Sequence, residues 1–237
     1  MAALNGQRTF LQIQNEIGTW LFNQTAPSAN TFPTLQSIKD VVNKWYKRFA
    51  GQARWEWAKN EGTVATVNGT TRITMPDTVM DVANLNIRNI SQPLLIYPRQ
   101  KFLQIYPSGW TLTGNGIPQM AVEAIPAANG AKQYDLWPTP NAIFTINYDA
   151  WQHVTPLAAD GDYSIIPPEF DDILVHGPIS EFYQIQADPR NEYHEAQVAK
   201  IMSRVWMQQE QMTNLLNTIR GDEIMFGQPV IFPYQQY

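Results

Sequence analysis

The chain has 237 residues, a formal net charge of −5 and no cysteine. Its hydrophobic fraction of 44% and its 28 aromatic residues exclude an intrinsically disordered chain, and its acidic balance argues against a generally basic nucleic-acid-binding protein. A disulfide scaffold and a cysteine-based metal or redox site are impossible without cysteine.

The first sixty residues predict two amphipathic helices. Apolar residues recur at spacings of three and four from Phe10 to Leu21, and again from Leu35 to Phe49. Thr34 is placed to cap the second helix, because a threonine hydroxyl accepts a hydrogen bond from an amide of the first turn. Gly51 is expected to end that helix.

The middle of the chain changes to the period of β-strands. Apolar residues flank Asn68-Gly69 on both sides, which predicts a hairpin because a type I′ turn needs positive φ at both central residues. Further strands are expected at 82–90, 101–106, 119–125, 133–137 and 143–151. Short strands between frequent turn signals are typical of an antiparallel sandwich or barrel-like domain.

Helical periodicity resumes near Pro167-Pro168. One helix is expected over 168–186, with a break at Asp188-Pro189, and a longer one over 190–220. Its apolar stripe begins at Val198, and His194, which sits between Tyr193 and Glu195, is expected on an exposed face. Gly221 is expected to end this helix, and no further helix is predicted after it.

These elements predict an α+β fold. Residues 1–52 and 165–220 form a helical domain, residues 53–164 form an inserted antiparallel β-sandwich or barrel-like domain, and residues 221–237 form an extended docking tail. The net charge changes from basic to acidic along the chain: residues 1–60 carry a net +4, residues 61–150 a net −1 and residues 151–237 a net −8. The basic and acidic ends could lie on different surfaces, or the helical ends could simply carry more charge than the middle.

No motif predicts an enzyme, a cofactor or a bound metal. His153, His176 and His194 lack the spacing of zinc ligands, and Asp160-Gly161-Asp162 lacks the closing acidic residue of a calcium loop. Nucleotide-binding and hydrolase motifs are absent from the sequence. We therefore expect no catalytic activity.

Two sequence features could bind a partner. Lys44, Lys47 and Arg48 share one helix face, either as the solvated side of an amphipathic helix or as a contact for phosphates or an acidic protein surface. The C-terminal tail is rich in apolar and aromatic residues, which usually dock on their own domain or on a neighbour. The predicted anchors of the tail are Phe226, Pro229, Ile231, Phe232, Tyr234 and Tyr237.

An ordered series of motifs resembles the head-to-tail adaptor, or connector, proteins of tailed bacteriophages. The series consists of Trp45-Tyr46, Trp55-x-Trp57, the strand pair at 63–76 with Met75-Pro76-Asp77, the segments at 113–118 and 136–140, Ile146-Asn147-Tyr148 leading to Asp160-Gly161-Asp162, and 166–170 followed by 174–177. The resemblance spans residues 10 to 220, and the family carries no catalytic residues to transfer.

The resemblance implies a structural protein of the virion neck, at the junction of head and tail, that assembles in the host cytoplasm. Such adaptors form homo-oligomeric rings, commonly twelve-fold, between the portal and a tail or further neck protein. They continue the DNA channel, through which DNA passes without sequence-specific binding. An acidic C-terminal third would help DNA to slide, because like charges repel.

Two alternatives stay open. The protein could be another virion ring, such as a tail-terminator or tail-tube protein. The aromatic-rich β-domain could instead be a carbohydrate-binding module, although the alternation of its tryptophans is typical of core positions.

The sequence also predicts where the protein is made and how its surface is used. No segment has the roughly 20 apolar residues of a membrane helix, and the N-terminus lacks the pattern of a signal peptide. We therefore expect a soluble protein that is made in the cytosol and has no membrane partner.

The 38 Asn and Gln residues match the 37 charged residues in number. Amides are buried against neighbouring subunits at lower desolvation cost than charges, so we expect a surface suited to subunit contacts.

Overall fold

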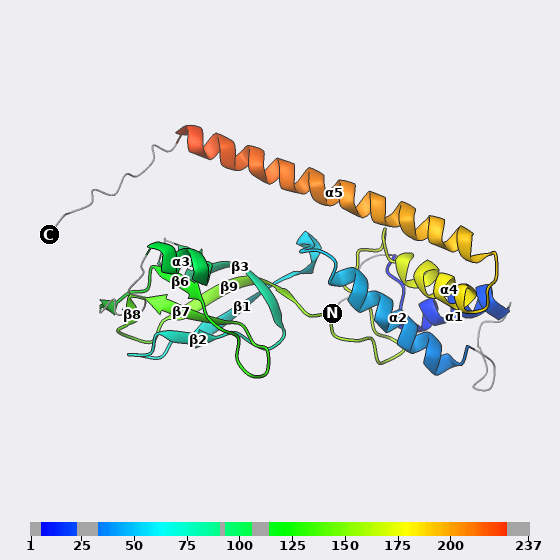
Figure 1. The fold of residues 1–237 in the computed structure, drawn as a ribbon, viewed down its shortest axis with the longest axis horizontal. Helices are drawn as coiled ribbons and strands as arrows, with labels where there is room; N and C mark the ends of the chain where they lie inside the picture. Colours follow the sequence, from blue (N-terminus) through cyan, green and yellow to red (C-terminus); the bar gives the residue numbers. More distant parts are fainter. Residues whose placement is uncertain (1–5, 23–32, 91–92, 106–113, 227–237) are drawn as a thin grey trace. The chain divides into compact units, whose positions relative to one another are not determined.

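The computed structural model describes the backbone of residues 6–22, 33–90, 93–105 and 114–226, and their side chains as far as Gln211 (Figure 1). The chain divides into two compact units, one made of residues 1–45 and 157–237 and the other of residues 46–156. The first unit is helical and the second holds the sheet, which confirms the predicted α+β fold with a barrel-like domain.

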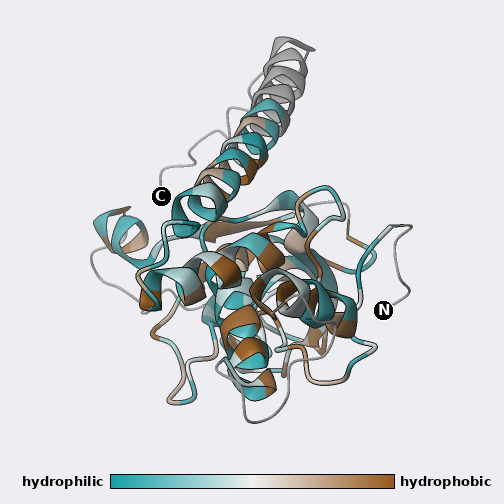
Figure 2. Cartoon of the chain, turned by 90° about the vertical axis from the view of Figure 1, so that its right-hand side faces the viewer, coloured by the Kyte–Doolittle hydropathy of each residue, from teal (hydrophilic) through white to brown (hydrophobic). Residues whose placement is uncertain are grey.

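The helical unit is arranged around a buried helix, α4 (Ile173–Ile185). Nine of its 13 residues are buried, because α4 is apolar on nearly all sides and must be covered on nearly all sides. The unit also contains α1 (Phe10–Phe22), α5 (Asn191–Phe226) and the part of α2 (Leu35–Ala50) up to Trp45. Figure 2 shows apolar segments alternating with polar ones along the helices.

The starts of α1 and α2 follow from their capping residues. The Thr9 hydroxyl accepts a hydrogen bond from the Gln12 amide at 3.2 Å, and the Gln12 side chain accepts one from the Thr9 amide at 2.8 Å, which forms a capping box. The Thr34 hydroxyl accepts from the Ser37 amide at 3.2 Å. The predicted cap at Thr34 is therefore confirmed, as is the end of α2 just before Gly51.

The expected end of the last helix at Gly221 is wrong. Helix α5 continues through Gly221 to Phe226, so residues 221–226 are helical and not part of an extended tail. A glycine in a helix interior costs only about 1 kcal/mol relative to alanine, and the residues after Gly221 are compatible with a helix. The other expected tail residues, 227–237, lie outside the described part of the chain.

The β unit contains one curled sheet of seven strands in the order β1-β9-β3-β4-β6-β7-β2 (Figure 1). The bounds are β1 (Lys59–Ala65), β2 (Arg72–Thr74), β3 (Val79–Ile87), β4 (Pro93–Tyr97), β6 (Met120–Glu123), β7 (Gln133–Trp137) and β9 (Thr145–Gln152). Two short strands, β5 (Asn115–Gly116) and β8 (Thr139–Pro140), pair separately. Alternate residues of β9 point into the core, namely Ile146, Tyr148 and Ala150.

The sequence predicts a sheet that is antiparallel throughout, but the sheet is mixed. Strands β4 and β6 pair in parallel, which requires a crossover connection of a dozen or more residues. That connection contains a short helix, α3 (Arg99–Ile105), where a strand was predicted over 101–106. The carbonyl of Pro98 accepts the first helical bond from the Phe102 amide at 3.0 Å, and the Phe102 side chain is buried.

The predicted hairpin at Asn68-Gly69 is wrong in its pairing. Strand β1 pairs with β9 and strand β2 pairs with β7, so the two strands flanking the turn do not pair with each other. Gly69 has a φ of +74° but Asn68 has no positive φ, so the turn is not of type I′. The Thr66 amide donates to the Phe144 carbonyl at 2.9 Å, which directs the chain toward the partner strand β9.

We predict that Gly177→Ala destabilises the helical unit. A Cβ at position 177 would lie 2.5 Å from the indole of Trp45, and such overpacking costs about 1–3 kcal/mol, more than the roughly 1 kcal/mol that alanine gains in a helix interior. Chemical denaturation should show a net loss of stability. Gly161→Ala is the control, because its Cβ would meet nothing within 4 Å. Equal stability of the two variants would contradict the close packing of α2 on α4.

Candidate functional site

The three basic residues predicted to contact phosphates or an acidic surface lie in different surroundings. The Lys44 ammonium pairs with Glu181 of α4 at 2.6 Å, and the neighbouring Trp45 indole donates to the other oxygen of the same carboxylate at 3.1 Å. Lys47 belongs to the β unit and lines a cavity there, and Arg48 is exposed. Lys44 therefore has an acidic partner within its own unit, and the role of the three residues stays a prediction.

Basic residues from the start of the chain pair with acidic residues from its last third. Lys39 contacts Asp160 at 3.3 Å, Lys44 contacts Glu181, and Arg8 contacts Asp171. Three of the seven basic residues of the first sixty thus pair with acidic residues of the last third within the helical unit, and the other four, Lys47, Arg48, Arg54 and Lys59, belong to the β unit. By composition the helical unit carries a net −7 and the β unit a net +2.

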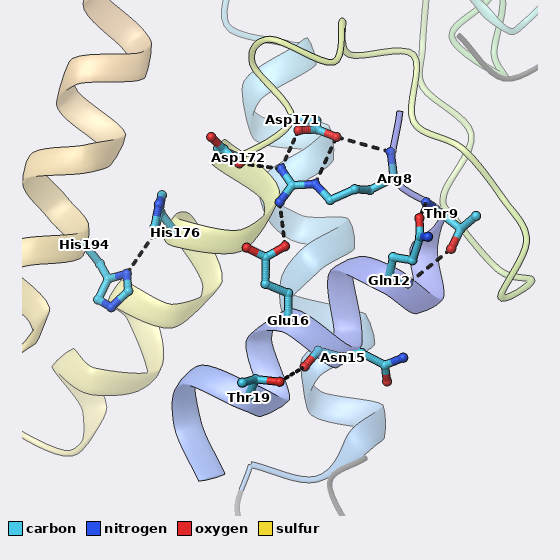
Figure 3. Close-up of polar contacts among 10 residues, drawn as sticks. All are labelled: Arg8, Thr9, Gln12, Asn15, Glu16, Thr19, Asp171, Asp172, His176 and His194. Carbon is cyan, nitrogen blue, oxygen red and sulfur yellow. Dashed lines mark hydrogen bonds and ion pairs between the residues drawn. The ribbon is translucent and has the colours of Figure 1, made fainter. Parts of the chain in front are cut away.

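Arg8 is the centre of the largest of these ion-pair groups (Figure 3). Its guanidinium forms a two-pronged contact with Asp171 and further ion pairs with Asp172 and Glu16, both at 2.6 Å. The Asp171 side chain is only 5% exposed. Burial by itself would lower the pKa of Arg8, but the hydrogen bonds and negative charges of Asp171 and Glu16 outweigh it and raise that pKa. This group fastens the start of α1 to the start of α4.

A histidine pair joins α4 to α5. The Nδ1 atoms of His176 and His194 lie 2.9 Å apart, a distance at which one ring must donate and the other accept (Figure 3). Burial, the neighbouring His176 and Arg190 lower the pKa of His194 to about 4. Burial also lowers the pKa of His176, against the raising effect of Asp172 and Glu16. The contact is therefore made by neutral imidazoles.

Next to the histidine pair, aromatic rings from three helices line a cavity of about 310 Å³. The ring of Trp20 meets the edge of His194 with centroids 5.1 Å apart, and Tyr193 lies 6.3 Å from Trp20. The residues that line the cavity are Trp20, Tyr183, Arg190, Tyr193 and His194. We call this group the aromatic pocket.

Arg190 closes one side of the aromatic pocket without contributing a free charge. Its guanidinium lies over the Tyr183 ring at 4.5 Å and pairs with Asp188 at 2.6 Å. Hydrogen bonds from Arg190 lower the pKa of Asp188 to about 2. The pocket is therefore aromatic and close to electrically neutral.

The sequence did not predict the aromatic pocket, because His194 was expected on an exposed face. In the structure His194 is 2% exposed. The available signal was its position four residues before Val198, which places both residues on the same face of the helix. Because histidine is a polar residue type, it is not counted as part of an apolar stripe, although His194 lies on the same helix face as Val198.

Asp160-Gly161-Asp162 forms a turn in which the Asp162 carboxylate accepts hydrogen bonds from the Ala158 and Ala159 amides. Within the described residues there is no group of three or more His, Asp or Glu side chains that could hold a metal ion. No helix in the described part of the chain is long and apolar enough to cross a membrane.

The predicted tail anchors fall mostly outside the described part of the chain. Phe226 is the last residue of α5. The other five are Pro229, Ile231, Phe232, Tyr234 and Tyr237, and none of them is among the described residues.

Comparison with known proteins gives one family. A family model described as SU10 adaptor protein matches residues 8–220, which span both the helical and the β unit. A comparison with curated proteins gives no match.

We predict that Arg8→Ala lowers the free energy of unfolding by about 3 kcal/mol, because it leaves the buried Asp171 carboxylate without its cation. Arg8→Lys should lose less, since an ammonium keeps the charge but not the two-pronged geometry. The exposed Lys200 provides the control, and Lys200→Ala should change stability by less than about 0.5 kcal/mol. Chemical denaturation measures all three, and an Arg8→Ala variant as stable as the control would contradict the assigned role.

We predict a loss of stability as the pH falls from about 6.5 to about 4. Because the pKa of His194 is lowered on folding, the unfolded chain binds a proton in this range before the folded chain does, so acid favours unfolding. The expected contribution is on the order of 2 kcal/mol, and His194→Gln should flatten the profile. His153→Gln, a change at an exposed histidine, should leave it unchanged. Identical profiles for the two variants would contradict a buried neutral His194.

Proposed function

The chain belongs to the SU10 adaptor protein family, a family of phage head–tail adaptors, and from this premise we propose that it forms a ring beneath the portal. In this position it joins the head to the tail and continues the DNA channel. The match over residues 8–220, which leaves neither unit out, is the observation that carries the proposal.

Membership of the family makes the protein a structural component of the virion that associates with other virion proteins, such as the portal and the tail. The finer assignments are our proposal. They are a homo-oligomeric ring of about twelve copies, a position in the neck, assembly in the host cytoplasm, and no catalytic role.

Charge supports the passage of DNA through such a ring. The helical unit carries a net −7, and an acidic surface facing the channel would repel the phosphate backbone and discourage adhesion. The abundance of Asn and Gln supports a protein with large subunit contacts, since buried amides cost less desolvation free energy than buried charges.

Electron microscopy of the full chain mixed with its portal tests the proposal. We expect closed rings bound at the distal end of the portal, and the same density in the neck of the intact particle. Rings that stack without the portal and lie along the tail would support a tail-tube protein instead. A protein that stays monomeric in the presence of the portal would overturn the proposal.

A further inference from the structure

The aromatic pocket is open at the surface of the helical unit. Trp20 is 45% exposed and Tyr193 is 51% exposed, although both belong to residue types that usually bury most of their surface. Ile185, two residues after the pocket residue Tyr183 in α4, is not part of the lining but is itself 63% exposed. An open cavity of about 310 Å³ with such walls suits an apolar, ring-bearing segment of another chain.

The polar side chains of the pocket indicate which kind of segment can bind there. The charge of Arg190 is paired with Asp188, and the imidazoles of His176 and His194 bond to each other. Among the described side chains that line the cavity, no unpaired charge is left to recognise an anion or a cation. An uncharged segment containing proline and aromatic rings is the best fit, because proline rings dock on the faces of Trp and Tyr.

This chain contains such a segment. Residues 227–237 hold two prolines and three aromatic residues and no charged residue. Its densest part is the run from Pro229 to Tyr234, in which Phe232 and Pro233 are adjacent.

The segment cannot reach the pocket of its own chain. Tyr193 and Phe226 are separated by 33 residues of the unbroken helix α5, which at 1.5 Å per residue is roughly 50 Å. Phe232 follows Phe226 by six residues, which span at most about 22 Å when fully extended. Any Phe232 that enters the pocket must therefore come from another copy.

We propose that the aromatic pocket of one subunit binds the segment 227–237 of a second copy of this chain, with Phe232 and the flanking prolines against Trp20 and Tyr193. This inference rests on the proposed function in one respect, because ring assembly places the second copy alongside. It assigns the five predicted tail anchors from Pro229 to Tyr237 to a contact between subunits.

Disulfide cross-linking tests the contact directly, since the chain has no cysteine of its own. Tyr193→Cys and Phe232→Cys chains are mixed under assembly conditions and oxidised. We expect a covalent dimer of the two variants, and a ladder of higher species from the double variant. The matched control pairs Phe232→Cys with Ile143→Cys, a position 74% exposed in the β unit, and should give several-fold less dimer.

A second variant ties the cross-link to the pocket. Trp20→Ala, introduced into the Tyr193→Cys chain, should reduce the yield of dimer several-fold, whereas Trp20→Phe should keep most of it because an aromatic wall remains. Circular dichroism confirms that both variants are folded. An unchanged yield in the folded Trp20→Ala variant would overturn the assignment of the pocket.

The remaining outcomes separate this inference from the proposed function. Rings that form at the portal without the cross-link overturn the inference and leave the function intact. A disulfide within one chain of the double variant overturns the assignment to a second copy. A chain that gives neither rings nor dimers contradicts both proposals.

Discussion

The burial of α4 is the constraint on which the helical unit depends. A helix that is apolar on nearly every side is stable only when other helices cover it on nearly every side. Its partners come from both ends of the sequence, since α1 and α2 precede the β unit and α5 follows it. The two ends of the chain must therefore fold together, and the β unit is an insertion between them.

This arrangement brings basic residues from the start of the chain into contact with acidic residues from its end. Along the sequence the basic residues 1–60 and the acidic residues 151–237 are separated by 90 residues. In the fold, Arg8 meets Asp171 and Lys44 meets Glu181. The opposite charges at the ends of the chain therefore fasten the helices that cover α4. The acidic surplus that remains gives the unit its net −7.

The aromatic pocket lies at the edge of the same helical packing. It forms where the end of α1, the end of α4 and the start of α5 meet, and its rings lie next to the histidine pair, of which His194 is buried and His176 partly buried. The residues that hold the helices together thus lie next to those that form the exposed wall of the pocket. The neutral histidines hold α4 to α5, while Trp20 and Tyr193 present their exposed faces to solvent.

Local signals were reliable where one short segment decides its own structure. The stripes of α1 and α2, the cap at Thr34 and the break at Asp188-Pro189 depend on residues within a few positions of one another. Sequence patterns gave wrong predictions where the structure of a segment depends on a partner that is far away in the chain. Asn68-Gly69 predicts a hairpin, yet its flanking strands pair with β9 and β7, and residues 101–105 are helical as part of a crossover.

The sequence by itself determined the class of the protein, the order of helical and β segments, and the absence of cysteine chemistry, because composition and periodicity are local properties. The ordered motifs also indicated the adaptor family, and the family match over residues 8–220 confirms it. Only the tertiary structure decided which strands pair, where the charges meet, and that His194 is buried beside an open aromatic pocket. Those features arise from contacts between residues far apart in the chain, whose free energies no short stretch of sequence contains.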